Sequence, residues 1–114
     1  MRIDQLLVDA RECTGPLDDA DALAECLRNA ARAVGAEERG GCHAEFVPHG
    51  VTAVIVLAQS HMSISTWPEH RFAMVDILFC NPSMGPQRAW VVLEKVLKPA
   101  EATSQLVTRT LSRT

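Results

Sequence analysis

The pattern of hydrophobic and polar residues along the chain predicts strands over much of its length. Residues 51–58 and 71–79 are apolar runs, the first rich in β-branched side chains, as in strands buried within a sheet. Between them, residues 60–66 alternate with a period of two, which predicts a strand with one polar and one apolar face. The polar face carries His61, Ser63 and Ser65, and the apolar face carries Met62 and Ile64. Two buried strands on either side of a short polar one indicate an antiparallel sheet.

Three further segments have weaker strand patterns. Residues 3–10 have an apolar centre and end at a Thr-Gly-Pro break. Residues 42–47 follow a predicted turn at Gly40-Gly41 and precede a second turn at residues 48–50. Residues 104–111 alternate weakly, which predicts a last strand at an edge of the sheet.

Two segments have apolar residues at helical spacing. The first helix is expected after Asp18 or Asp19, either of which can cap it, and is expected to end before Gly35. Its apolar stripe consists of Leu23, Cys26, Leu27, Ala30 and Val34. The second helix follows a loop over residues 81–85, begins at Pro86 and stops before Pro99.

The order strand, helix, several strands, helix, strand predicts an α+β fold. Helices must bury their apolar stripes against the sheet, so we expect a two-layer sandwich with an antiparallel sheet and both helices on one face. The 114 residues are enough for one domain with its own core, and we expect a single domain over residues 1–114.

Composition and charge exclude several classes of partner. The net charge of −3 provides no basic surface for nucleic acid and no polybasic patch for a membrane. The first residues lack the apolar stretch of a signal peptide, so we expect a cytoplasmic protein. The four cysteines contain no C-x-x-C pair, so we predict no metal site and expect free thiols.

Considered alone, the polar face of residues 60–66 would be a solvated surface. A wider set of motifs changes that interpretation: Phe46-Val47-Pro48-x-Gly50-Val51-Thr52, Gln59-Ser60-His61-Met62-Ser63-Ile64, Thr66-Trp67-Pro68-Glu69, Ala73-Met74-Val75-Asp76 and Cys80. This pattern resembles the prokaryotic S-adenosylmethionine decarboxylases, which are pyruvoyl-dependent enzymes of polyamine biosynthesis. The resemblance covers nearly the whole chain.

The resemblance implies self-cleavage between Gln59 and Ser60. The products would be a β chain of residues 1–59 and an α chain that begins at position 60 with a pyruvoyl group made from Ser60. This group is the expected cofactor, because its carbonyl can accept the electron pair left when carbon dioxide departs. The implied substrate is S-adenosylmethionine, and the implied assembly is a homodimer of processed α/β heterodimers.

The resemblance also assigns roles to four other residues. Cys80 corresponds to the proton donor to the substrate α-carbon, although a free cysteine that ends a strand is more often a buried hydrophobe. Glu69 corresponds to the carboxylate that binds the ribose hydroxyls, and Phe46 to an aromatic ring on the adenine. Thr52 keeps a hydroxyl where the family commonly has serine.

The chain departs from the family at Gln59, where glutamate is common, and at Ser65, where the family has histidine. That histidine is expected to remove a proton during self-cleavage, and a serine hydroxyl is a very poor base at neutral pH. His70 is one candidate substitute, although it lies beyond a turn. Three functions therefore stay open: an S-adenosylmethionine decarboxylase, a divergent pyruvoyl decarboxylase of arginine or ornithine, and an unprocessed homologue that only binds a nucleoside or a partner.

Overall fold

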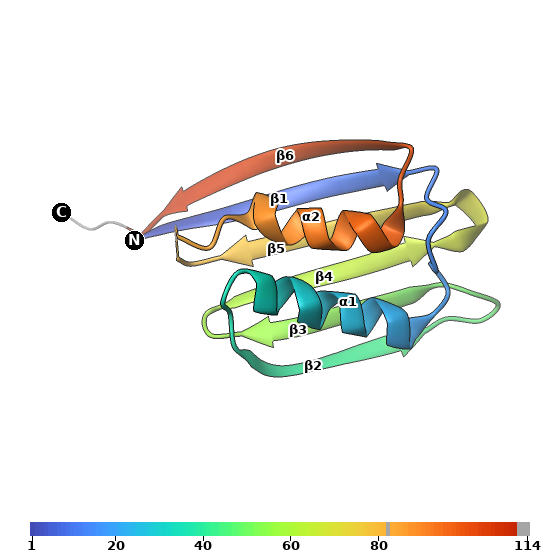
Figure 1. The fold of residues 1–114 in the computed structure, drawn as a ribbon, viewed down its shortest axis with the longest axis horizontal. Helices are drawn as coiled ribbons and strands as arrows, with labels where there is room; N and C mark the ends of the chain where they lie inside the picture. Colours follow the sequence, from blue (N-terminus) through green and yellow to red (C-terminus); the bar gives the residue numbers. More distant parts are fainter. Residues whose placement is uncertain (82, 112–114) are drawn as a thin grey trace.

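The computed structural model describes residues 1–81 and 83–111. Within these residues, two helices lie on one face of a six-stranded antiparallel sheet (Figure 1). The elements in chain order are β1 (Arg2–Arg11), α1 (Ala20–Ala33), β2 (Glu38–Glu45), β3 (Val51–Leu57), β4 (Ser60–Trp67), the 3₁₀ helix η1 (Pro68–His70), β5 (Phe72–Phe79), α2 (Pro86–Leu97) and β6 (Glu101–Thr110). The strands are ordered β2-β3-β4-β5-β1-β6 across the sheet. The predicted two-layer α+β sandwich is confirmed.

Helix α1 begins and ends where its capping residues predict. The Asp19 carboxylate accepts a hydrogen bond from the Ala22 N–H, which satisfies one of the amides left free at a helix N-terminus. Gly35 follows the helix in the left-handed conformation, with φ of 76°. Its N–H donates to the Arg32 carbonyl at 3.1 Å, so glycine ends the helix here.

Helix α2 begins at Pro86, as predicted, and ends at Leu97. Lys98 adopts a left-handed conformation after the helix, and its N–H donates to the Glu94 carbonyl. The predicted loop before this helix includes Pro82, which lies outside the described residues. No helix in the described part of the chain is long and apolar enough to cross a membrane.

The core lies between the helices and one face of the sheet. Strand β4 shows how the alternation builds it, because Met62 and Ile64 are fully buried under the helices while Ser63 between them is on the opposite face. The largest fully buried side chains include Phe79, Leu23, Leu27, Ile77, Leu93 and Leu97. The sequence pattern therefore identified the buried face of β4 correctly.

The prediction of a turn at Gly40-Gly41 is wrong. Both glycines lie inside β2, which begins at Glu38 and pairs with β3 after a bulge between Glu38 and Gly40. A Cβ atom on Gly41 would lie 2.8 Å from the Val54 carbonyl oxygen, so glycine is needed here for close approach of two strands. The same dipeptide in sequence is typical of turns, and only the neighbouring strand reveals the difference.

The last strand is longer than predicted. It begins at Glu101 instead of Ser104, because β6 pairs with β1 along its whole length, from Arg2 opposite Thr110 to Arg11 opposite Glu101. Its predicted position at an edge of the sheet is confirmed.

The face of the sheet opposite the helices is covered by no element of the described chain (Figure 1). Four large hydrophobic side chains of this face are 36–46% exposed: Leu7, Val56, Trp67 and Met74. We refer to this surface as the open face.

Gly15 is the position in the fold where a methyl group should do most harm. It lies against the end of α2, where a Cβ atom would be 1.9 Å from the Val96 carbonyl oxygen. We expect Gly15→Ala to lower the free energy of unfolding by more than about 2 kcal/mol, because backbone must move to admit the methyl group. Gly40→Ala is the matched control, since a Cβ atom added there would have no neighbouring atom of the described chain within 4 Å. Urea denaturation of both variants measures the difference, and equal stabilities would contradict this account.

Candidate active site

Ser60 lies at the tight turn between β3 and β4. Leu57 pairs with Ser60, so Ala58 and Gln59 alone connect the two strands. Gln59 adopts a left-handed conformation, with φ of 56°, which costs a non-glycine residue of the order of 1 kcal/mol. The Ser60 side chain points to the helix-covered face, and the residue is 6% exposed. The peptide bond between Gln59 and Ser60 therefore lies at the start of β4, and it joins an exposed residue with a strained backbone to a buried serine.

Cys80 lies beside this turn. Its backbone N–H donates to the Ser60 Oγ at 3.0 Å. Its thiol donates to the Ala58 carbonyl at 3.7 Å and to the Gln59 Oε1 at 3.9 Å. The fold thus brings together three residues that the sequence analysis selected, Gln59, Ser60 and Cys80, and we call them the first half-site.

The other cysteines differ from Cys80 in their surroundings. Burial raises the pKa of the Cys26 thiol to about 12, with a further contribution from Glu25, and burial also raises the pKa of Cys13. Both thiols are therefore held in the neutral form within the core. Cys42 is exposed in the middle of the edge strand β2, where it pairs with Val54. Cys80 is the thiol that the fold places beside Ser60.

A second group of residues surrounds a cavity of about 460 Å³ at the other end of β4. The lining includes Phe46, His49, Thr52, Ser65, Trp67 and Glu69. Four of these are predicted site residues, and they come from β3, β4, η1 and the loop between β2 and β3. We call Phe46, His49, Thr52, Ser65 and Glu69 the second half-site.

Two contacts organise the polar side of the second half-site. The Thr52 and Ser65 hydroxyls are 3.2 Å apart, because these residues are paired in the β3–β4 register. The His49 Nε2 lies 3.3 Å from the Glu69 Oε1. The site therefore contains a hydroxyl pair and a histidine–carboxylate pair around one cavity.

The loop that carries Phe46 and His49 is held at both ends. The Phe46 N–H donates to the Gly50 carbonyl, and the Gly50 N–H donates to the Asp18 carboxylate, both at 2.8 Å. Asp18 thus fixes this loop, whereas the neighbouring Asp19 caps α1. The buried Thr66 hydroxyl adds a third support, since it accepts from the Val51 N–H and donates to the Leu17 carbonyl.

The two half-sites lie at opposite ends of the sheet. Ser60 and Ser65 are five residues apart on one extended strand, which corresponds to a separation of about 17 Å. Their side chains also point to opposite faces, because Ser60 is under the helices and Ser65 is on the open face. Figure 1 shows the β3–β4 turn at the left end of the sheet and the β2–β3 connection at the right end. One copy of the chain does not bring Ser60 to Ser65.

Three histidines bear on the choice of a base. His70 is exposed in η1 and is not among the residues that line the cavity. His61 is half-buried on the open face, and none of its contacts with the described residues assigns it a role. His49 was missed, because it occupies an unspecified position of a motif. The sequence feature that could have identified it is its position, three residues after Phe46 and directly before Gly50 of the predicted turn.

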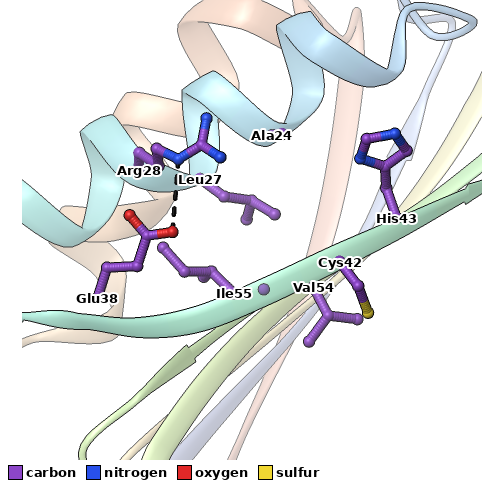
Figure 2. Close-up of a pocket in the computed structure, with 9 residues that line it drawn as sticks. Ala24, Leu27, Arg28, Glu38, Cys42, His43, Val54 and Ile55 are labelled. Carbon is purple, nitrogen blue, oxygen red and sulfur yellow. Dashed lines mark hydrogen bonds and ion pairs between the residues drawn. The ribbon is translucent and has the colours of Figure 1, made fainter.

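A separate cavity of about 270 Å³ lies between α1 and the edge strand β2 (Figure 2). Arg28 and Glu38 reach across one end of it, 3.5 Å apart, and His43 stands at the other end. It contains none of the predicted site residues.

Known proteins resemble this chain in sequence and in fold. The model of the S-adenosylmethionine decarboxylase family matches residues 4–110, which is most of the chain. The chain belongs to this family.

The relatives that match the chain include S-adenosylmethionine decarboxylase proenzymes of two organisms. The chain is 37% identical over 82 residues to the S-adenosylmethionine decarboxylase proenzyme of Thermosipho africanus, a match that covers 72% of this chain and 63% of that protein. It is 41% identical over 85 residues to S-adenosylmethionine decarboxylase proenzyme 2 of Bacillus anthracis, covering 75% and 69%. The chain thus spans somewhat less than two thirds of the length of the Thermosipho relative.

A solved structure of the family has the same fold. The adenosylmethionine decarboxylase of Aquifex aeolicus superposes with a TM-score of 0.89 and 30% sequence identity, covering 97% of this chain and 92% of that one. The likeness of fold therefore extends over most of both chains.

Proposed function

We propose that the chain is a self-processing S-adenosylmethionine decarboxylase whose product serves spermidine synthesis. It would form one domain and be cleaved between Gln59 and Ser60. The observation that carries this proposal is the first half-site, where a serine follows a strained residue in a tight turn beside a thiol. Family membership supports the same reaction class.

The residues at the turn fit the formation of a pyruvoyl group. Ala58 and Gln59 are exposed, so the chain can be broken between Gln59 and Ser60 without opening the core. Cleavage would also release the left-handed strain at Gln59. When formed from Ser60, the group would supply a carbonyl that accepts the electron pair released as carbon dioxide leaves the substrate.

Self-cleavage would proceed in two steps. In the first, the Ser60 oxygen bonds to the Gln59 carbonyl carbon, the carbon–nitrogen bond breaks and the hydroxyl proton passes to the nitrogen, which leaves an ester. In the second, a base removes the α-proton of residue 60, the electron pair forms a carbon–carbon double bond, the Cβ–oxygen bond breaks, and Gln59 leaves as a carboxylate. Tautomerisation and hydrolysis by water then release ammonia and leave the pyruvoyl terminus.

Three side chains would act on the substrate. Cys80 has a thiol beside the turn and would give a proton to the α-carbon after decarboxylation. Phe46 and Glu69 share one cavity, which suits an adenine ring stacked on the phenyl group and ribose hydroxyls bonded to the carboxylate. These two residues belong to the second half-site, about a strand's length from Cys80.

The separation of the half-sites supports a homodimer of processed α/β heterodimers. The open face of the single chain exposes four large hydrophobic side chains: Leu7, Val56, Trp67 and Met74. An exposed apolar surface of this kind is typical of one that a partner buries. A two-fold axis through the middle of this face would pack two sheets against each other, with the backbone of the β3–β4 turn of each copy opposite the second half-site of the other. Each complete site would then contain residues of both copies.

The chain's surroundings are proposed to be the cytoplasm. Its four cysteines are free thiols in the structure, which suits a reducing compartment. Because the net charge of the chain is −3, we propose neither a nucleic-acid partner nor a membrane partner.

The test combines mass measurement with a substrate assay. We expect purified protein to separate into fragments of residues 1–59 and 60–114, and to release labelled carbon dioxide from carboxyl-labelled S-adenosylmethionine. Arginine and ornithine are assayed in parallel. Fragments with release from one of those amino acids alone would replace the proposed substrate, and a full-length chain under all conditions would overturn the proposal.

A further inference from the structure

We propose that His49 is the base of the second step of self-cleavage, acting on residue 60 of the facing copy in the dimer. This inference rests on the proposed function and names a residue that the motif left unspecified. The observation that supports the inference is the position of His49, which lines the same cavity as Thr52 and Ser65.

The second half-site needs a proton acceptor, and its hydroxyls do not provide one. Thr52 and Ser65 bond to each other at 3.2 Å, and hydroxyl groups are negligible bases at neutral pH. A carboxylate is in general a weaker base than an imidazole. An imidazole changes its charge near neutral pH and is the side chain most often used for proton transfer. His49 is the imidazole among the residues that line this cavity.

The contact with Glu69 prepares His49 for this role. The carboxylate lies 3.3 Å from the Nε2 and therefore favours the tautomer with its proton on that nitrogen. The Nδ1 is then the free acceptor, and the carboxylate stabilises the cation that forms when it takes a proton. The second oxygen of Glu69 stays available for the ribose hydroxyls after processing is complete.

The backbone around His49 is fixed before any partner arrives. The Phe46 N–H bonds to the Gly50 carbonyl, and the Asp18 carboxylate holds the Gly50 N–H. His49 is in the middle of this braced loop and its side chain is 33% exposed, so it is accessible from the cavity yet restricted in position. A base must be held within reach of its proton, and this loop provides such a support.

The proton in question is on the α-carbon of residue 60 in the ester. His49 Nδ1 would take it, the electron pair would form the double bond to Cβ, and the Cβ–oxygen bond would break with release of the Gln59 carboxylate. The proton on the imidazole would then return to water. No other reactant is needed for this step.

The experiment measures cleavage of His49→Gln by intact mass over time. We expect cleavage to slow by about a hundred- to ten-thousand-fold, the usual loss when a general base is removed. The ester should accumulate, so hydroxylamine should cut the variant between residues 59 and 60 and leave an intact serine at the new terminus. Adding Ser65→His to this variant should restore cleavage, which also demonstrates that the variant is folded.

His70→Gln is the matched control, because it removes an exposed imidazole of η1 from outside the cavity. We expect it to cleave at the wild-type rate. Slow cleavage of His70→Gln together with normal cleavage of His49→Gln would assign the base to His70 and overturn the inference.

Co-expression tests whether the base acts across the dimer. We expect the His49→Gln chain to be cleaved when it is paired with a Ser60→Ala chain, whose second half-site is intact. Absence of this recovery would show that His49 does not act on the facing copy. Wild-type protein that is never cleaved would refute the proposed function itself, whereas cleaved wild type with unaffected His49→Gln would refute only this inference.

Discussion

Replacing Ser60 with alanine is expected to leave the purified protein as one uncut chain of 12.5 kDa. The hydroxyl of Ser60 is the nucleophile of the proposed first step, and it already accepts a bond from the Cys80 N–H at the turn. Alanine removes the oxygen that forms the ester, so no slower route through the same chemistry remains. Electrospray mass spectrometry of the intact protein measures this directly, and decarboxylation should be lost together with cleavage.

Ser63→Ala is the control for that experiment. It removes a hydroxyl from the same strand, but Ser63 is on the open face and belongs to neither half-site. We expect its cleavage to match the wild type. Cleavage that persisted in Ser60→Ala at the same bond would eliminate the pyruvoyl mechanism, because another residue would then have to supply the nucleophile.

Replacing Cys80 with alanine is expected to separate processing from turnover. The Cys80 backbone N–H, which bonds to Ser60, is retained in the variant, so cleavage should continue. Loss of the thiol removes the proposed proton donor, and we expect decarboxylation to fall by about a hundred- to ten-thousand-fold. The measurements are intact mass for cleavage and release of labelled carbon dioxide for turnover.

Cys42→Ala is the control for the thiol, since Cys42 is exposed on β2, where it pairs with Val54, and belongs to neither half-site. It should cleave and turn over as the wild type does. If Cys80→Ala decarboxylated at the wild-type rate, the proton would have to come from another group, and the role of Cys80 would be limited to its backbone contact.

The sequence alone determined the elements that build the core between the helices and the sheet. One local repeat produces the apolar stripe of α1, which ends before Gly35, and another produces the alternation of residues 60–66. Such repeats can be recognised in a sequence because each element must bury one face. The motifs also identified Ser60 and Cys80, which the structure brings into contact at the turn. Local periodicity was sufficient for the elements, whereas Ser60 and Cys80 were selected through the resemblance to a known family.

Strand boundaries at the sheet edges depended on pairing instead. Gly40 and Gly41 were predicted to form a turn because they are adjacent glycines, yet they are held in β2 by β3. Residues 101–103 became part of β6 because β1 extends beside them. A strand at an edge has little burial to mark its ends, so its length is set by the neighbour to which it bonds.

Only the tertiary structure decided how the site residues are divided. Ser60 and Ser65 are close in the chain, but an extended strand separates them by about 17 Å and turns them to opposite faces. Residues far apart in the sequence, such as His49 and Glu69, meet at 3.3 Å because a loop and a 3₁₀ helix end at the same corner of the sheet. The sequence named most members of the candidate site, while the geometry of the strands determined which of them lie together.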